Sequence, residues 1–284
     1  MAIKIRHILL GALLMISIAI VINVFYKTTK SGYKNNTTTN KEPIYCVMIT
    51  GKDKSRWNFA HIAIDNFKRQ SHPNKRLIII NEGASLMGTG MEVMVDNILE
   101  IKLNDREEKG ITLGDMRNIA FEFIPDGAIW TLWDDDDWRS DDYLDYLYTN
   151  LQDKDYDYVL FTKRLEHNLN TGFTWIMELK SGFVILFGRK QASGKCRYES
   201  KDVNEDVLLK KHIIDNLKFK LIENNDPKIY IRMVHKTNTS LLVNQNKSLV
   251  KDTSQNKVYY EYDASDGDVQ YVKNIVDEKY NLYN

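Results

Sequence analysis

Short apolar segments alternate with helical patterns between residues 44 and 133, and this alternation restricts the fold more than any other feature. The intervening patterns repeat apolar residues at the spacing of one helix face. Strands that alternate with helices predict an α/β fold, with a mostly parallel central sheet and helices on both faces. The expected strands are residues 44–50, 76–80, 98–103 and 128–133, and the expected helices are residues 57–70 and 113–124.

The fourth expected strand runs directly into four aspartates at residues 134–137. Adjacent carboxylates repel one another, so a cation or solvent must compensate them. In an open α/β sheet, ligands bind beyond the carboxyl ends of the strands, where this segment is expected. Carboxylates suit Mg²⁺ or Mn²⁺, and such an ion can neutralise a diphosphate. The segment therefore predicts a metal site. The alternative is the acidic start of the next helix, with Ser140 as its N-cap.

The second half of the chain has a more mixed pattern. Strands are expected at residues 158–162, 173–177, 183–187, 217–222 and 229–233, and a helix at residues 203–214. Beyond about residue 244 the sequence is polar. Near its end, Val269, Val272, Ile275 and Val276 keep helical spacing, which predicts a surface helix.

The N-terminal region has the pattern of a membrane segment. Residues 8–26 carry no charge, and their length suits a helix that crosses the hydrocarbon core. A cleaved signal peptide is the alternative, since Lys4 and Arg6 precede the apolar run, but no small-residue cleavage site follows it. We therefore expect an uncleaved anchor and, at residues 27–42, a flexible polar stem. Basic residues flank the anchor on both sides, so the positive-inside rule barely decides its orientation.

Charge and cysteine content exclude two classes of protein. The 39 basic residues balance the 39 acidic residues of this 284-residue chain, and no basic stripe interleaved with aromatics indicates nucleic-acid binding. The two cysteines, Cys46 and Cys196, are too few for a zinc site. They could pair in an oxidising compartment. Because Cys46 lies in an apolar run, a buried free thiol is the favoured interpretation.

Four segments carry further motifs in a fixed order. Residues 43–83 contain a strand, a helix, a Gln-x-x-Pro-Asn link and a second strand. Residues 113–144 contain Gly-x-x-Arg-Asn, then a strand and Asp-x-Asp-Asp-Trp. Residues 202–212 contain Glu-Asp, and residues 230–240 contain Arg-x-x-His. Together these segments resemble the family 2-type glycosyltransferases, which have the GT-A fold. The resemblance is continuous from about residue 43 to 142 and patchier to about residue 240.

The resemblance implies a metal-dependent, inverting, hexosyltransferase-like enzyme. It would move a sugar from a nucleotide-diphosphate donor to a hydroxyl of a glycan, glycoprotein or lipid acceptor. Asp206, beside Glu205, would accept the proton of that hydroxyl. Mn²⁺ or Mg²⁺ would be bound by Asp136, Asp137 and His235. The donor would be contacted by Thr50, Asn81, Glu82, Arg117, Asp134 and Asp135.

Each of these roles has a plainer structural alternative. Asp206 could be a solvated charge near a helix start, Arg117 could pair with a structural carboxylate, and His235 could be structural. The sequence also departs from the family at Asn81-Glu82-Gly83, where the family usually has Asp-Asp-Gly. A non-catalytic glycan-binding or scaffold relative with the same fold is therefore a competing hypothesis. A sugar-nucleotide pyrophosphorylase ranks lower, because no Gly-rich phosphate loop follows the first strand.

These expectations define a domain layout. Residues 1–7 form an N-terminal tail, 8–26 the anchor, 27–42 the stem, 43–245 the GT-A domain and 246–284 a C-terminal extension. By the same resemblance, the chain is expected to be a type II single-pass membrane protein with its catalytic domain in the secretory lumen.

Overall fold

The computed structural model describes residues 41–88, 92–104, 106, 108–152, 155–179, 185–191, 196–223, 226–235, 251–252 and 257–280. The chain from Glu42 onward forms one compact unit. The expected anchor at 8–26, and the expected stem up to residue 40, lie outside the described residues. Within the described part, no helix has the length and apolar character needed to span a membrane.

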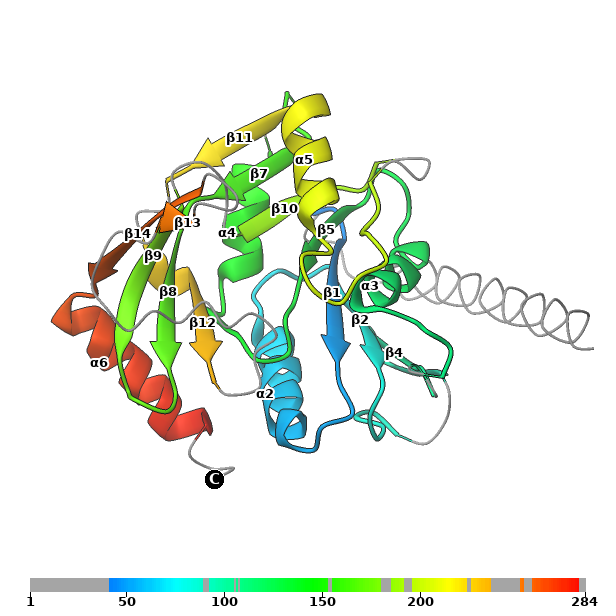
Figure 1. Cartoon of the computed structure of the whole chain (residues 1–284), viewed down its shortest axis with the longest axis horizontal. Coiled ribbons are helices and arrows are strands. Elements are labelled where there is room, and N and C mark those ends of the chain that lie inside the picture. Colours follow the sequence, from blue (N-terminus) through cyan, green and yellow to red (C-terminus); the bar gives the residue numbers. More distant parts are fainter. Residues whose placement is uncertain are drawn as a thin grey trace, which may run out of the picture. The chain divides into compact units, whose positions relative to one another are not determined.

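A large eight-stranded sheet forms the centre of this unit (Figure 1), in the order β11-β7-β10-β5-β1-β2-β4-β3. Only β3 and β10 run antiparallel to their neighbours, so the prediction of a mostly parallel sheet is confirmed. The strands are β1 (Ile44–Thr50), β2 (Lys75–Asn81), β3 (Glu92–Val95), β4 (Ile98–Lys102), β5 (Ile129–Leu132), β7 (Tyr158–Phe161), β10 (Ile185–Arg189) and β11 (Phe219–Ile222).

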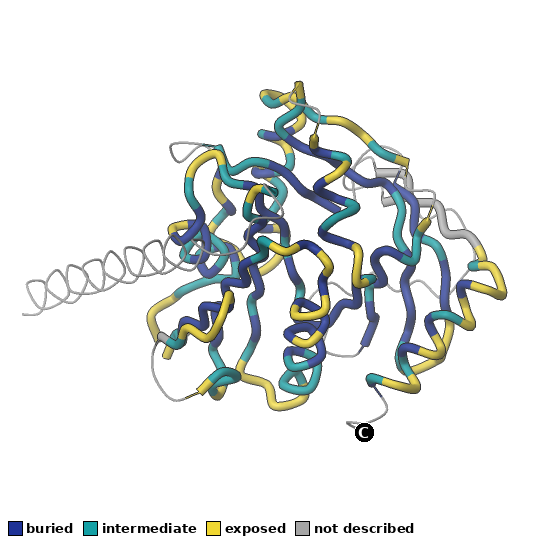
Figure 2. The backbone as a smooth tube through the Cα atoms, turned by 180° about the vertical axis from the view of Figure 1, so that it is seen from behind, coloured by how far each residue is buried: buried dark blue, intermediate teal, exposed yellow. Residues whose placement is uncertain are grey.

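Helices cover both faces of the large sheet. Successive side chains of a strand point to opposite faces, and Ile129 and Trp130 of β5 show this division. Ile129 joins the core built with α2 (Ser55–Arg69) and α4 (Tyr143–Asn150), whereas Trp130 packs edge-on against Phe121 of α3 (Leu113–Glu122). Because both faces are covered, the strands are buried along most of their length, as Figure 2 shows.

A second, six-stranded sheet has the order β13-β14-β9-β8-β12-β6. α6 (Asp266–Ile275) continues into a π-helical turn (Val276–Tyr280), and their buried residues Val272, Ile275 and Tyr280 join a core that includes Trp138 and Ile231. The predicted C-terminal helix is thus confirmed. The strands are β6 (Trp138–Arg139), β8 (Lys163–Asn168), β9 (Thr174–Leu179), β12 (Tyr230–Val234), β13 (Lys251–Asp252) and β14 (Lys257–Asp263).

One expected helix start and one alternative interpretation of the sequence differ from the structure. The helix expected from residue 203 is α5 (Val207–Asn216), which begins later because Asn204 has a φ of 58° and turns the chain. Asparagine tolerates this left-handed conformation better than most residues. The acidic start of a helix also does not account for residues 134–137, since they lead into β6, and α4 begins only at Tyr143 with Asp142 as N-cap.

Glu42, where the described unit begins, is held by three other parts of the unit. Its backbone N–H donates to the Tyr148 hydroxyl at 3.1 Å, and its carbonyl oxygen lies 3.1 Å from His72 Nε2. Its carboxylate receives two hydrogen bonds from Arg189, each 2.8 Å long. These contacts fix the chain just before β1, at the amino-terminal edge of the parallel strands.

Candidate active site

The candidate residues gather at the carboxyl edge of the large sheet. Thr50 ends β1 and is paired in register with Asn81, which ends β2. The segment of four aspartates follows β5, the other neighbour of β1. This is the edge at which open α/β sheets bind their ligands. The segment then crosses into β6, so residues 134–137 connect the two sheets.

Two amide side chains, one in α2 and one at its C-cap, hold the chain that follows the acidic segment. Asn66 donates to the Arg139 carbonyl at 2.6 Å and accepts from the Arg139 N–H at 3.0 Å. Gln70 donates to the Ser140 carbonyl at 2.7 Å and accepts from the Leu144 N–H at 3.0 Å. Gln70 is the first residue of the Gln-x-x-Pro-Asn motif, so the motif has a structural reason: it places the start of α4 against α2.

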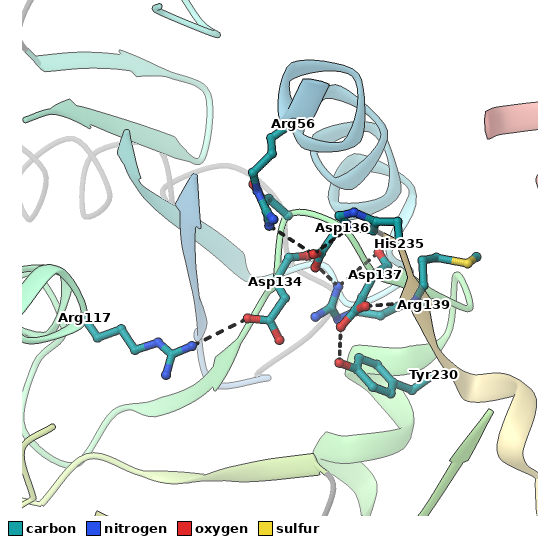
Figure 3. A network of polar contacts seen from close by, with 10 residues as sticks. Arg56, Arg117, Asp134, Asp136, Asp137, Arg139, Tyr230 and His235 are labelled. Atoms are coloured by element: carbon teal, nitrogen blue, oxygen red, sulfur yellow. Dashed lines mark hydrogen bonds and ion pairs between the residues drawn. The ribbon is translucent and has the colours of Figure 1, made fainter. Parts of the chain in front are cut away.

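Asp137 is bound to the second sheet on both of its oxygens (Figure 3). Oδ1 accepts from the Met233 N–H at 3.1 Å, and Oδ2 accepts a short hydrogen bond from the Tyr230 hydroxyl. Burial, and then the charges of Asp136 and Asp134, raise the pKa of Asp137 to about 7. Both oxygens of Asp137 thus connect the acidic segment to β12, and its expected role as a metal ligand stays a prediction.

Arg139 supplies a buried positive charge beneath the segment. Its guanidinium lies 4.3 Å from the centre of the Trp133 ring and 5.0 Å from that of Tyr230, at distances where cation–π attraction operates. Its Nη1 donates to the carbonyls of Asp134 and Asp137 at 3.3 and 3.4 Å. Arg139 therefore offsets part of the repulsion among the carboxylates.

Asp135 and Asp136 share the guanidinium of Arg56, the second residue of α2. Figure 3 shows Arg56 pointing toward Asp136. Arg56 makes two hydrogen bonds to Asp135, and its Nη2 lies 3.0 Å from Asp136 Oδ2. Burial and the Asp136 charge raise the pKa of Asp135 to about 6, against the effect of Arg56. Burial acts in the same direction on Asp136, but His235 and Arg56 outweigh it and lower the pKa of Asp136 to about 2. Asp136 is thus held more firmly in its ionised form than Asp135 or Asp137.

His235 follows β12 and reaches the same carboxylate. Its Nε2 lies 3.1 Å from Asp136 Oδ2, and its ring stacks on Phe59 of α2 with 4.6 Å between ring centres. Cis ligands of an ion bound at about 2.1 Å lie about 3.0 Å apart, so this spacing fits two donors on one metal. Among the described residues, no three His, Cys, Asp or Glu side chains group closely enough to hold a metal. The pair therefore fits an ion that takes its remaining ligands from phosphate and water, as Mg²⁺ commonly does.

The Gly-x-x-Arg-Asn motif brings α3 against the Glu-Asp segment. A Cβ on Gly114 would lie 1.7 Å from the Glu199 carbonyl oxygen, so only glycine permits this approach. Asn118 exchanges hydrogen bonds of 2.9 and 3.0 Å with the Tyr198 backbone. Between them, Arg117 forms a short ion pair with Glu205. The motif therefore packs α3 against the loop before α5 and holds that loop by hydrogen bonds and an ion pair.

Arg117 also links this loop to the acidic segment, since its Nη2 lies 3.9 Å from Asp134 (Figure 3). The structural alternative for Arg117 thus has direct contacts in its favour. Burial raises the pKa of Glu205, and Arg117 opposes this rise. The adjacent Asp206 pairs with Lys210 at 2.5 Å, and its side chain keeps 27% of its exposure. Of these two carboxylates, Asp206 is the one that solvent and ligands reach more easily.

The turn after β2 is held together by its own polar side chains. The Asn81 amide is used within the turn, since it donates to Ala84 O at 2.7 Å and to Glu100 at 2.6 Å and accepts from the Gly83 N–H at 2.6 Å. Glu82 lies 2.8 Å from Arg106. Thr50 is buried beside this turn. Contact of Asn81 and Glu82 with a nucleotide base stays a prediction.

Sequence reasoning did not identify Arg56, Arg139, Tyr230 or Glu100. Four adjacent carboxylates do signal that cations must lie close by. Nothing in the local sequence of Arg56, 79 residues before Asp135, selects it from the other basic residues. Glu100 is wholly buried on β4 and accepts from Ser85 and from the N–H groups of Leu86 and Met87. A charged residue within an apolar strand was the available signal.

Comparison with known proteins gives a distant structural likeness. No family model matches the chain, and no curated protein matches it. It is similar to a crystal structure of S. aureus TarS, with a TM-score of 0.48 and 11% identity, over 68% of this chain and 37% of that one. Two structures of TarS 1–349 have TM-scores of 0.48 with UDP and 0.49 with UDP-GlcNAc, at 12% and 11% identity. They cover 68% and 69% of this chain, which spans 60% of their length.

Proposed function

We propose that this protein is a family 2-type, GT-A-fold glycosyltransferase that uses a nucleotide-diphosphate sugar. The observation that carries the proposal is the convergence of sequence-distant motifs around the acidic segment. Arg117 of α3 bridges Asp134 and Glu205, and His235 after β12 meets Asp136. If each motif had only its own structural role, there would be no need for α3, the acidic segment, the Glu-Asp pair and the residue after β12 to meet at the carboxyl edge of a sheet.

Asp206 is the proposed catalytic base. A carboxylate that accepts the proton of an attacking hydroxyl must be accessible and ionised. Asp206 keeps part of its exposure, while Glu205 is held by Arg117. Lys210, one helical turn further along α5, stabilises the ionised form of Asp206. Direct attack by the acceptor hydroxyl on the anomeric carbon would invert its configuration, with Glu205 and Arg117 keeping Asp206 in place.

Asp136 and His235 are the proposed protein ligands of Mn²⁺ or Mg²⁺. Bound there, the ion would neutralise charge on the diphosphate leaving group. Asp137 is proposed to hold the segment through Tyr230 and Met233 rather than to bind the ion. The expected membrane anchor at 8–26, the type II orientation, the luminal location and a glycan, glycoprotein or lipid acceptor belong to the same proposal, as the resemblance implies them.

A non-catalytic glycan-binding relative is the second candidate, and one observation favours it. The Asn81 amide, where the family usually has an acidic contact to the donor, is used by hydrogen bonds within its own turn. Such a relative would retain the acidic segment for its fold contacts and would not release nucleotide from any donor.

The test is donor turnover by the full-length protein in detergent. A panel of UDP-, GDP- and dTDP-sugars is screened for release of free nucleotide diphosphate, with Mn²⁺ and with EDTA. We expect release from one donor that requires the metal and is lost in Asp136→Asn. Asp215→Asn, which removes an exposed carboxylate from α5, is the matched control and should retain activity. Absence of both release and nucleotide binding across the panel would contradict the proposal and favour the glycan-binding candidate.

A further inference from the structure

Arg56 lies where a cation is needed. It is in the first turn of α2 and reaches the acidic segment 79 residues further along the chain (Figure 3). Its Nε donates to Asp135 Oδ2 at 3.1 Å, and its Nη2 contacts both Asp135 Oδ1 and Asp136 Oδ2. A single guanidinium thus contacts two of the four aspartates, and its one positive charge offsets part of their repulsion.

This contact is largely shielded from water. The side chain of Arg56 keeps 17% of its exposure, that of Asp135 1% and that of Asp136 10%. The guanidinium of an arginine is always charged, and that of Arg56 lies against the carboxylates of Asp135 and Asp136. Arg56 is therefore a permanent positive charge, and ion pairs with so little water are screened weakly.

The guanidinium and the expected metal require the same oxygen. Asp136 Oδ2 lies 3.0 Å from Arg56 Nη2 and 3.1 Å from His235 Nε2. A metal bound by Asp136 and His235 would lie within a few ångströms of the guanidinium. Two positive charges this close repel each other, and the repulsion is larger when one of them is a divalent ion.

We propose that Arg56 is a resident cation that excludes the divalent ion from Asp136 until a nucleotide diphosphate arrives. The diphosphate offers the guanidinium another anionic partner, since arginine binds phosphate oxygens with two parallel hydrogen bonds. Once Arg56 turns to the phosphates, Asp136 Oδ2 and His235 Nε2 become available to the ion. Metal and nucleotide then bind together, because each brings charge of the opposite sign to the site. The inference rests on the proposed function, because it specifies how that site acquires its metal.

The test measures Mn²⁺ binding to the full-length protein by electron paramagnetic resonance, with and without UDP and GDP. Without nucleotide, Arg56→Gln should bind Mn²⁺ at least about tenfold more tightly than the wild type, because a neighbouring positive charge is gone. Arg56→Lys should fall between the two, since lysine keeps the charge but cannot span Asp135 and Asp136. With the nucleotide that binds, the difference between wild type and Arg56→Gln should shrink.

Lys68→Gln is the matched control, because it removes one exposed positive charge from the same helix. It should bind Mn²⁺ like the wild type. Equal or weaker Mn²⁺ binding by Arg56→Gln without nucleotide would overturn the inference, while metal-dependent nucleotide binding by the wild type would leave the proposed function standing. If no variant binds Mn²⁺ or nucleotide, both the inference and the proposed function fail.

If thermal unfolding shows that Arg56→Gln is not folded, Arg56→Lys replaces it in the test. Tighter Mn²⁺ binding by Arg56→Lys than by the wild type supports the inference, and equal or weaker binding overturns it.

Discussion

The acidic segment at residues 134–137 and the Glu205-Asp206 pair both place carboxylates side by side, but the fold supports them differently. Asp137 is bound to β12 through Tyr230 and Met233, and Asp136 meets Arg56 from α2. The segment is therefore braced from two sides. The Glu205-Asp206 pair is braced mainly by α3, through Arg117. Asp206 opens α5 and stays partly exposed.

The difference agrees with the separate roles that we propose for the two regions. Carboxylates fixed on two sides keep a constant geometry, which suits binding of a cation and a diphosphate. A carboxylate at a helix start, held by one neighbour, remains accessible to an incoming hydroxyl. In each region one carboxylate (Asp137 or Glu205) supports the fold, and its neighbour (Asp136 or Asp206) is the one proposed to act on a ligand. The four predictions below test that division, from the largest expected effect to the smallest.

Asp206→Asn should cause the largest loss of function. Removing a general base typically lowers the turnover rate by about 10²–10⁴-fold, and the variant should fold normally because the Asp206 side chain is partly exposed. Donor turnover and a thermal melt measure the two quantities. Asp215→Asn removes the other carboxylate of an i,i+4 pair on α5 and should change neither. Undiminished turnover in Asp206→Asn would show that Asp206 is not the base.

Asp137→Ala should cause the largest loss of stability. Two buried donors, the Tyr230 hydroxyl and the Met233 N–H, lose their partner at about 1–3 kcal/mol each, so the free energy of unfolding should fall by about 2–6 kcal/mol. Urea denaturation measures it. Asp141→Ala, which removes an exposed ion pair with Arg69, should cost less than about 1 kcal/mol. Equal effects at the two positions would refute the anchoring role of Asp137.

Gly114→Ala should separate α3 from the Glu-Asp segment. The added Cβ meets the Glu199 carbonyl, and overpacking of this kind costs about 1–3 kcal/mol. The control has the opposite sign: Gly267 lies in α6 with nothing closer than 3.8 Å, so Gly267→Ala should stabilise the protein by about 0.5–1 kcal/mol. Thermal or urea unfolding of both variants measures this. Destabilisation by Gly267→Ala, or none by Gly114→Ala, contradicts the packing argument.

Thr112→Ala should have the smallest effect. Thr112 and Asp115 form a capping box at the start of α3, and loss of the cap typically costs about 1 kcal/mol. Ser265 caps α6 in a similar way, so Ser265→Ala should cost a similar amount in urea denaturation. Because α3 carries Arg117, we expect only the Thr112 variant to reduce donor turnover as well. Equal turnover in the two variants would show that Arg117 does not depend on its helix start.

The large sheet could be predicted because its strands are short apolar runs separated by helical patterns. The place of the acidic segment followed from the same pattern, since chain that follows a parallel strand lies at its carboxyl edge. In the second sheet, the expected strands at residues 173–177 and 229–233 correspond to β9 and β12, whereas β8 was not expected. β8 contains Glu166, His167 and Asn168, all buried. Buried polar side chains of this kind erase the alternation from which a strand is recognised.

The partners of the carboxylates were also beyond the sequence. Compensation of the aspartates by cations follows from their repulsion, but the choice of Arg56 depends on how α2 packs across the sheet edge. Asn81 shows the reverse case. Its position at the end of β2 could be predicted, whereas its use within its own turn depends on Glu100, 19 residues away. Tertiary contacts therefore determine which candidate side chains stay accessible to a ligand and which are used in holding the fold.

The attachment of Glu42 gives the domain a polarity. Glu42 is fastened by Tyr148, His72 and Arg189 just before β1 begins at Ile44, and β1 ends at Thr50 beside the acidic segment. Seven residues of strand span roughly 23 Å. A force applied through the chain before Glu42 would therefore act at the end of the sheet remote from the carboxylates. It would be distributed over the three side chains that hold Glu42. The load on this attachment point would therefore not fall directly on the carboxylates.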